Sequence, residues 1–277
     1  MIKDPEKSNQ VELTLGYSPC PNDTYMFDGI ANQGLGIDGI GIRHSLFDVE
    51  TLNEMAMNQV LDITKLSFHA FFNASNHYQL IHSGSALGYN CGPVLISKQS
   101  FSKNDMKNRR VVFPGAWTTA HLLFRLWAPE AENRFFVPYD RIFNCLEKGE
   151  ADCGVIIHES RFTFESMGYK PIVDLGAWWE KKTRLPIPLG CIAARKRLGE
   201  KMIGKVEHLI RRSIKMAMED PGATIPYIRK YAMEMDEAVL KKHIRTFVNS
   251  FSLDLGKTGK EAVEALERMA KQAGVIQ

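Results

Sequence analysis

A histidine stands directly after an apolar run in the segment ADCGVIIHESRFTF, residues 151–164. The apolar run predicts a buried strand, and residues just past the ends of such strands line clefts in α/β proteins. Histidine titrates near neutral pH, so a neutral His158 could accept a proton from a ligand. Glu159 and Arg161 follow and could orient the ring or bias its charge. The alternative is a structural histidine that only ends a core strand.

A second polar segment, SPCPNDT, lies where an expected first strand meets an expected first helix. The start of a helix offers unpaired N–H groups and a partial positive charge, which suit a carboxylate or phosphate. Asn22 and Asp23 would line the cleft at this point. The alternative is that Asn22, Asp23 or Thr24 only caps the helix.

Two more loops carry short polar side chains at matching places. TKLS ends the third expected strand at Ser67, and PGAWTTA connects a strand to a helix through Thr118, Thr119 and Ala120. Their hydroxyl groups and the N–H groups of the starting helix would bind neutral or anionic oxygen atoms. Ordinary capping of the helix that follows is the alternative interpretation.

Known motifs do not offer another chemistry. GLGIDG, residues 34–39, matches G-x-G-x-x-G, but an expected helix precedes it and a strand follows. That order is the reverse of a dinucleotide site, so the segment is predicted to be a turn. The histidines have no close metal-ligand spacing on one helix face, and the sequence calls for no metal or cofactor.

The elements that must position these residues form two similar units. In each unit strands alternate with helices, which predicts a sheet of mainly parallel strands with crossover helices. The expected strands are VELTLGYS, IGIRHSLF and LDITKLSF in the first unit, and RRVVFPG, RFFVPY and ADCGVIIHES in the second. The segments GPVLISK and LPIPLGCIAARK also look like strands, and either could cross between the units.

From about Leu198 onward the sequence is predicted to be helical. If this tail packs on the first unit, the second unit is an insertion and a ligand cleft lies between two lobes. We therefore predict an α/β fold of the two-lobed, periplasmic-binding-protein-like (type II) kind. Residues 1–98 and 197–277 would form the first lobe, and residues 99–196 the second.

Composition limits the class of protein. The 277 residues are 44% hydrophobic and 24% charged, with a net charge of +3, so no electrostatic case exists for a nucleic acid or membrane partner. The sequence has no apolar run of about 20 residues, and its polar beginning does not resemble a secretory signal. Five scattered cysteines favour reduced thiols and a cytoplasmic location. A homodimer is left open.

Six segments together resemble the 1,4-dihydroxy-6-naphthoate synthase family of menaquinone biosynthesis, over about residues 11–255. They are SPCPNDTYMFDG, DITKLSFHAF, PGAWTTAHLL, GVIIHESRFTF, IVDLGAWWE and LPIPLGCIAARK. The resemblance implies a cofactor-independent lyase that converts cyclic dehypoxanthine futalosine to 1,4-dihydroxy-6-naphthoate and releases a three-carbon fragment. It also implies that His158 is the proton acceptor, and that Lys65, Leu66, Ser67, Thr119 and Ala120 contact the substrate.

Two other functions are left open at this point. The first is the related chorismate dehydratase of the same pathway, which shares the fold, although the HESRFTF and PCPNDT segments favour the synthase. The second is a solute-binding protein without chemistry. In a pure binder, His158→Ala would change affinity alone, whereas in an enzyme turnover would collapse while the substrate still binds.

Overall fold

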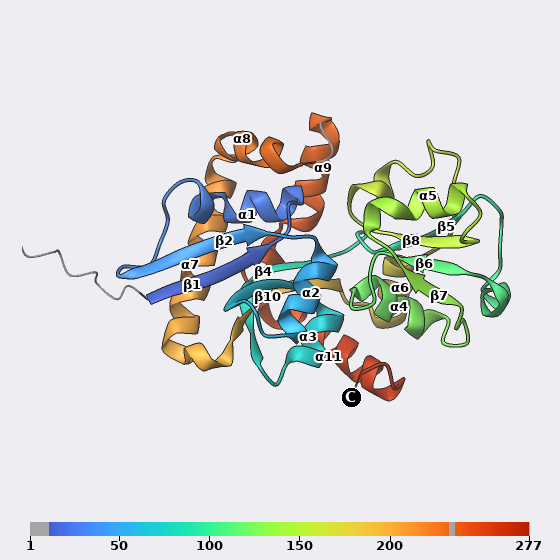
Figure 1. The fold of residues 1–277 in the computed structure, drawn as a ribbon, viewed down its shortest axis with the longest axis horizontal. Coiled ribbons are helices and arrows are strands. Elements are labelled where there is room, and N and C mark those ends of the chain that lie inside the picture. The colour runs from blue at the N-terminus through green and yellow to red at the C-terminus, as the bar shows by residue number, and fades with distance from the viewer. Residues whose placement is uncertain (1–10, 233–235, 277) are drawn as a thin grey trace, which may run out of the picture.

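Two lobes lie side by side in the computed structural model, each built around a five-stranded sheet (Figure 1). The structure describes residues 11–232 and 236–276. The polar N-terminal segment, for which no secretory signal was predicted, lies outside the described residues. The first lobe contains β1 (Val11–Tyr17), β2 (Ile40–Leu46), β3 (Ile63–Ser67), β4 (Tyr78–Gly88), β10 (Ile187–Arg195), α1 (Pro21–Ala31), α2 (Val49–Met57), α3 (Phe68–Ala74), α7 (Glu200–Glu219), α8 (Pro221–Tyr231), α9 (Glu237–Phe247), α10 (Ser250–Leu253) and α11 (Gly256–Gln272).

The second lobe is smaller and has the same kind of sheet. It contains β5 (Val94–Ser97), β6 (Val111–Phe113), β7 (Arg134–Phe136), β8 (Cys153–Ile156), β9 (Lys170–Asp174), α4 (Thr119–Trp127), α5 (Ile142–Glu147) and α6 (Leu175–Thr183). Short 3-10 turns cover residues 103–108, 139–141, 158–162 and, back in the first lobe, 196–198.

Each sheet has one strand that runs against the others. The first sheet has the order β2-β1-β3-β10-β4, with β1 parallel to β2 and β3, and β10 antiparallel to β3 and β4. The second has the order β7-β6-β8-β5-β9, with β6 parallel to β7 and β8, and β5 antiparallel to β8 and β9. Four strands of each five therefore share a direction, and the mainly parallel sheets are confirmed.

The reversed strands are the two that the sequence marked as crossing between lobes. β5 pairs within the second sheet and β10 within the first, so the chain passes between the sheets at residues 89–93 and 184–186. This pairing differs from the predicted ranges, in which residues 94–97 fell in the first lobe and residues 187–195 in the second. The domain boundaries themselves stay a prediction.

The start of α1 also differs from the sequence prediction. The helix begins at Pro21, and Cys20 occupies the N-cap without a side-chain cap. Proline fits the first helical position, so Asn22, Asp23 and Thr24 fall inside the first turn instead of capping it. The next helix has an ordinary cap, because the Asp48 side chain accepts from the N–H groups of residues 50 and 51 at the start of α2. The elements α3, β4, β9 and α6 were not predicted.

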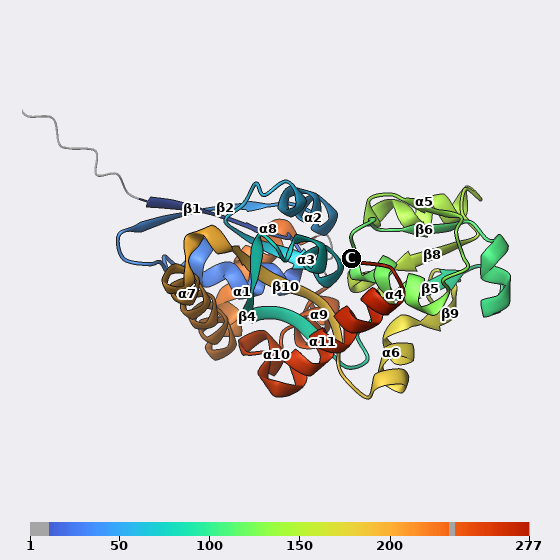
Figure 2. The ribbon, with the colours of Figure 1, turned by 90° about the horizontal axis from the view of Figure 1, so that it is seen from below.

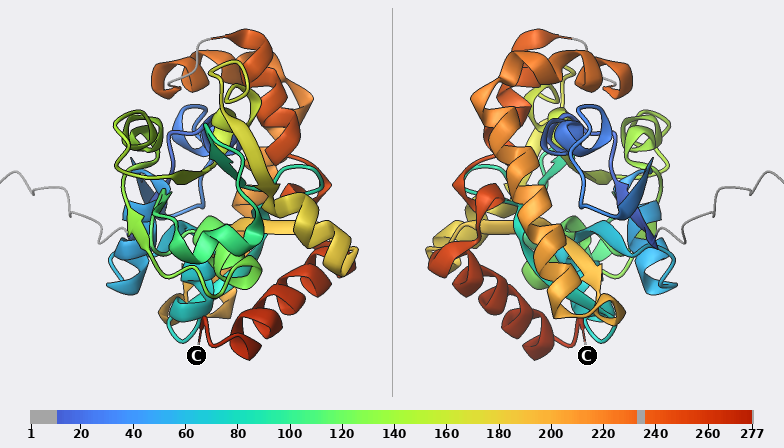
Figure 3. Two further views of the ribbon diagram at one scale, coloured as in Figure 1. Left: turned by 90° about the vertical axis from the view of Figure 1, so that its right-hand side faces the viewer. Right: turned by 90° about the vertical axis from the view of Figure 1, so that its left-hand side faces the viewer.

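The two lobes share packing on one side. A continuous cluster of buried apolar side chains includes Leu66 of β3, Leu123 of α4 and Leu266 of α11. Figure 2 shows α11 reaching from beneath the first lobe toward α4, and these two helices are in contact. In contrast, α7 runs along the side of the first lobe that is remote from the second (Figure 3, right).

Two smaller predictions can be read from the same structure. The segment 34–39 is a turn between α1 and β2, in which Gly34 and Gly39 have positive φ angles, as predicted. Of the helices in residues 11–232 and 236–276, none is long and hydrophobic enough to cross a membrane.

Candidate active site

A cavity lies between the lobes, where the carboxyl ends of β1, β3, β6 and β8 face each other. It has a volume of about 710 Å³, including its opening to solvent. All ten site residues predicted from the sequence line it: Asn22, Asp23, Lys65, Leu66, Ser67, Thr118, Thr119, Ala120, His158 and Arg161. Thr24 and Glu159, which the sequence also offered as a cap and as a neighbour of His158, do not line it. The rule that ligand sites lie at the carboxyl ends of strands therefore predicted lining residues from both lobes, and each lobe provides one wall of the cavity.

A buried ion pair forms the wall that belongs to the first lobe. Lys65 Nζ lies 2.6 Å from Asp23 Oδ1, and the two side chains are 7% and 1% exposed. Asp23 also accepts hydrogen bonds from the Ser18 hydroxyl (2.6 Å), the Ser18 N–H (3.2 Å) and Asn22 Nδ2 (2.8 Å). Because its oxygens are occupied, this carboxylate is suited to neutralising and holding Lys65 and not to accepting a proton.

A glycine in β10 allows this strand to lie close to Leu66 and Lys65 of β3. Gly190 in β10 is opposite Ser67 in β3. A Cβ atom at Gly190 would lie 2.9 Å from the carbonyl oxygen of Leu66 and 3.2 Å from Cε of Lys65. Any other residue here would displace β3 or the lysine side chain.

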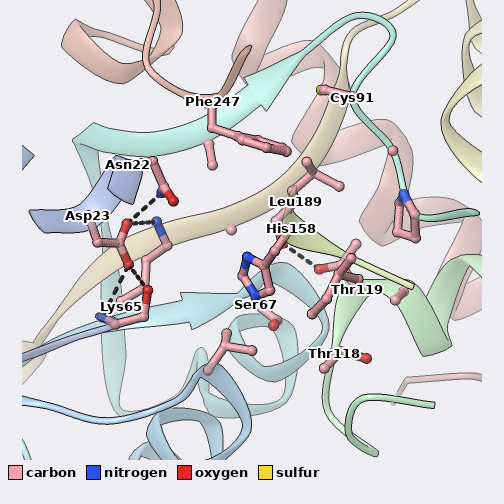
Figure 4. Close-up of a pocket in the computed structure, with 18 of the residues that line it drawn as sticks. Asn22, Asp23, Lys65, Ser67, Cys91, Thr118, Thr119, His158, Leu189 and Phe247 are labelled. Carbon is pink, nitrogen blue, oxygen red and sulfur yellow. Dashed lines mark hydrogen bonds and ion pairs between the residues drawn. The ribbon is translucent and has the colours of Figure 1, made fainter. Parts of the chain in front are cut away.

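His158 is the central side chain of the wall from the second lobe. β8 ends at Ile156, and His158 begins the 158–162 turn with a φ angle of 58°, a left-handed conformation that is uncommon outside glycine. The histidine therefore stands two residues beyond the strand, not at its end. Figure 4 shows it between the Asp23–Lys65 pair on one side and Thr119 on the other.

Burial favours the neutral form of the His158 ring. Burial lowers its pKa from the ordinary 6.5, against the opposing effect of the Glu159 and Asp23 charges. The Cys20 Sγ atom lies 3.5 Å from Nδ1, and burial raises the pKa of this thiol to about 12, so it is a neutral neighbour. The ring of Tyr139 meets His158 edge-on at 5.2 Å between centroids. A neutral imidazole that faces a ligand cavity can accept a proton at neutral pH.

The threonine hydroxyls are used by the protein itself. Thr119 Oγ1 donates to the Leu189 carbonyl (2.6 Å) and accepts from the Phe68 N–H (3.0 Å). Thr118 Oγ1 donates to the Gly115 carbonyl and accepts from an N–H of the first turn of α4. The predicted oxygen-binding surface is therefore better provided by the N–H groups at the start of α4 than by these hydroxyls.

Ser67 and Arg161 are held in different ways. Ser67 Oγ accepts from Asn53 Nδ2 at 3.2 Å, which leaves the hydroxyl proton available to a ligand. The Arg161 guanidinium donates to the Gly92 carbonyl and to Asp174 Oδ2, the latter at 3.1 Å. It thus fixes the 158–162 turn to the ends of β5 and β9.

Several residues of the site were missed by sequence analysis. The cavity is also lined by Ser18, Val49, Cys91, Leu189, Gly190 and Phe247. Leu189 and Gly190 come from one of the two segments that the sequence marked as strands able to cross between the units, and Cys91 lies just before the other. Phe247 ends α9, a helix with no cleft signal in its sequence. Within the described ranges, no group of three histidine, cysteine or acidic side chains could hold a metal ion.

Trp117 and Trp179 are not among the residues that line the cavity. Trp179 is completely buried, and its Nε1 donates to the Pro186 carbonyl at 3.0 Å, so it is a buried strut. Trp117 packs on His69, with 5.6 Å between ring centroids.

Comparison with solved structures confirms the predicted fold class. A protein from Archaeoglobus fulgidus superposes with a TM-score of 0.91 at 30% identity, covering 97% of this chain and 100% of that one. The alkanesulfonate-binding protein of Xanthomonas axonopodis pv. citri gives a TM-score of 0.72 over 98% of this chain and 96% of that one. At 12% identity, this second likeness shows the fold alone, which periplasmic sulphonate-binding proteins share.

Sequence comparison identifies the family. A 1,4-dihydroxy-6-naphtoate synthase from Thermus thermophilus is 41% identical over 267 residues, which is 95% of each chain. One from Streptomyces coelicolor is 37% identical over 270 residues, 95% of this chain and 94% of that one. The sequence model of a family described as menaquinone biosynthesis matches residues 13–272. The chain belongs to this menaquinone biosynthesis family.

Proposed function

We propose that the protein is a 1,4-dihydroxy-6-naphthoate synthase. It would act as a carbon–carbon lyase on cyclic dehypoxanthine futalosine and release a three-carbon fragment, without a cofactor. The 41% identity to the Thermus thermophilus synthase over nearly the whole chain supports the assignment. The observation that carries the chemistry is the placement of His158, which lines the cavity opposite the buried Asp23–Lys65 pair, where burial lowers its pKa.

In the proposed reaction, His158 removes a proton from a carbon next to a carbonyl or hydroxyl group. General base catalysis of this kind contributes about 10²–10⁴ in rate. The electrons of the broken C–H bond form an enolate with a neighbouring carbonyl group. As the enolate collapses to form a new ring double bond, the carbon–carbon bond to the three-carbon fragment breaks, the fragment leaves with its electron pair and takes the proton from His158, and the ring becomes aromatic. Formation of the aromatic ring supplies driving force, so no electron sink is needed.

Two sets of donors are suited to the oxygen that becomes negative. Lys65 has ammonium protons beyond the one that meets Asp23, and the N–H groups at the start of α4 lie across the cavity. A donor that is already oriented toward a developing oxyanion contributes about 10²–10³ in rate. The substrate carboxylate is also compatible with the positive end of α4.

The proposal places the reaction in the cytoplasm. The five cysteines are free and buried in the structure, which suits a reducing compartment.

The test is an assay of the purified protein with cyclic dehypoxanthine futalosine, with dihydroxynaphthoate followed by absorbance and mass. Wild type is compared with His158→Ala, with His158→Asn and with His208→Ala, an exposed control on α7. Asparagine tolerates the left-handed backbone of residue 158 but cannot accept the proton. We expect both His158 variants to lose at least about 10² in kcat, with substrate binding changed only a few-fold.

The pH profile adds a second readout. Since His158 must be neutral to act, wild-type kcat/KM should fall on the acid side with an apparent pKa below 6.5. Full activity in the His158 variants would support the enzymatic function but would show that His158 is not the general base. Tight binding of the substrate by wild type without turnover would instead support a binding protein, or the dehydratase if chorismate is then consumed.

A further inference from the structure

A second histidine, His243 of α9, lies directly behind the candidate site. Its side chain is 1% exposed. Its ring is stacked on that of His158, with 6.3 Å between centroids and 15° between planes. It also packs on Phe247, whose ring centroid is 4.7 Å away. His243 is not among the described residues that line the cavity, so it does not contact a ligand directly.

A chain of hydrogen bonds connects His243 to the ion pair of the first lobe. His243 Nε2 lies 2.9 Å from Asn22 Oδ1. Asn22 Nδ2 donates to Asp23 Oδ1, the same oxygen that lies 2.6 Å from Lys65 Nζ. Because the amide nitrogen of Asn22 is used toward Asp23, its oxygen faces the histidine, and His243 Nε2 must carry the proton.

The opposite nitrogen of the same ring faces the other lobe. Nδ1 lies 3.7 Å from Glu159 Oε2, in the turn that begins with His158. At that distance it makes no hydrogen bond, and Nδ1 is a buried atom without a partner. Burial lowers the pKa of His243 to about 3, so the ring is neutral. Neutrality matters here, because a cation at this position would repel a protonated His158 and Lys65.

We propose that His243 is a positioning residue that holds both walls of the site in one geometry. It acts on His158 by stacking on its ring and on the Asp23–Lys65 pair by orienting Asn22. This inference rests on the proposed function for its kinetic consequence, but its geometry can be measured without turnover. His158 needs such support, because its left-handed backbone is not a conformation that the isolated turn would favour.

Two variants separate the two contacts. His243→Phe keeps a flat ring against His158 but removes the donor to Asn22, whereas His243→Gln keeps a donor at the place of Nε2 but removes the ring. We expect His243→Phe to lower kcat by about 10–100-fold, with KM within about threefold, because Asn22 is no longer held. His243→Gln should have a kcat within about fivefold of wild type, since it keeps the hydrogen bond to Asn22, and the remaining loss measures the stacking on His158.

A double variant tests whether the effect passes through Asn22. If it does, His243→Phe combined with Asn22→Ala should be no more than about twofold slower than Asn22→Ala alone. If His243 only supported the fold, the losses of kcat from His243→Phe and Asn22→Ala would multiply in the double variant. The kcat of His243→Gln would then be as low as that of His243→Phe. Either result, or a wild-type kcat in His243→Phe, would overturn the inference.

Nitrogen-15 NMR of the histidine rings gives the measurement that does not depend on turnover. We expect the His243 ring to be in the neutral form protonated at Nε2 throughout pH 5–8. A ring that is protonated at Nδ1, or that titrates near pH 6.5, would overturn the inference even if the enzyme is active. A wild type that makes no product would count against the proposed function, and the NMR result would still decide the role of His243.

Discussion

Two of the contacts between the lobes are built differently. At the first, the loop between β6 and α4 is bound by direct hydrogen bonds from the first lobe. The Trp117 N–H donates to Glu50 Oε1 at 2.9 Å, and Thr119 bridges the Leu189 carbonyl and the Phe68 N–H at 2.6 and 3.0 Å. We call this contact the loop clasp.

At the second contact, the 158–162 turn meets α1 and α9 through longer distances. The Cys20 Sγ atom is 3.5 Å from His158 Nδ1, and Glu159 Oε2 is 3.7 Å from His243 Nδ1. Sulfur is a weak hydrogen-bonding atom, and the Glu159 contact is too long for a hydrogen bond. We call this contact the turn contact.

The difference assigns separate tasks to the two contacts. The loop clasp adjoins the apolar cluster that runs through both lobes, so opening it would expose buried surface and break several hydrogen bonds. The turn contact includes His158, and opening it would break no short hydrogen bond among those described above. We therefore expect the lobes to part at the turn contact when a substrate enters, with the 158–162 turn still bound by Arg161 to the ends of β5 and β9, while the loop clasp keeps the lobes together.

The largest effect is expected when the loop clasp is cut. Thr119→Val keeps the shape of the side chain but removes the hydroxyl, so the Leu189 carbonyl and the Phe68 N–H lose their partner. Buried polar groups left without partners should cost about 2–4 kcal/mol of unfolding free energy in total. Urea denaturation checks this value, with Thr119→Ser as the control that keeps the hydroxyl and should stay within about 1 kcal/mol. A loss of stability in Val no larger than in Ser would show that the clasp is not set by these bonds.

Acid should weaken the same contact, because two buried histidines belong to it. His69 of α3 packs on the ring of Trp117, with 5.6 Å between centroids, and His121 Nδ1 lies 2.8 Å from the Ala116 carbonyl oxygen. Burial lowers the pKa of each ring to about 4. The unfolded chain protonates these rings below about pH 6.5, whereas the folded protein does not until about pH 4. Stability is therefore unaffected above pH 6.5 and falls as the pH drops from 6.5 toward 4.

The loss at pH 5 should be on the order of 1–2 kcal/mol for each histidine. Unfolding free energies at pH 7.5 and pH 5 measure it in wild type and in His69→Gln, which does not titrate. We expect the difference between the two pH values to be smaller in the variant. An equal difference would mean that His69 plays no part in the acid sensitivity.

The sequence predicted which loops face each other across the cleft better than it predicted which residues they contact. The loops that carry Lys65, Thr119 and His158 follow buried strands, and the place of strand ends in an α/β sheet is general, so their convergence could be expected. The partners of those residues could not. Thr119 meets Leu189 only because β10 returns to the first sheet, and nothing local in its sequence says which sheet it joins.

His243 shows the second reason for incomplete prediction. In the sequence KKHIRTF it is one residue of an amphipathic helix that carries apolar and charged residues at helical spacing. A helix pattern tells which side is buried, but not which residues of a distant loop will pack on that side. The predicted cap of α1 was wrong for a related reason. Pro21 starts the helix, and the Asp23 carboxylate binds Ser18 and Lys65 instead of capping it.

The smallest effect is expected at the outer edge of the turn contact. Lys242 Nζ lies 4.4 Å from the centre of the Phe162 ring, and the lysine is exposed, so this cation–π contact should contribute no more than about 0.5 kcal/mol. Lys242→Met should leave the unfolding free energy within that range. Substrate KM should change about twofold, because the turn is held slightly less often in its closed position. Lys241→Met, which loses only a pair with Glu237 in the same helix, is the control. If Lys242→Met destabilised the protein as much as Thr119→Val, the turn contact would be as firm as the loop clasp, and substrate would have to enter elsewhere.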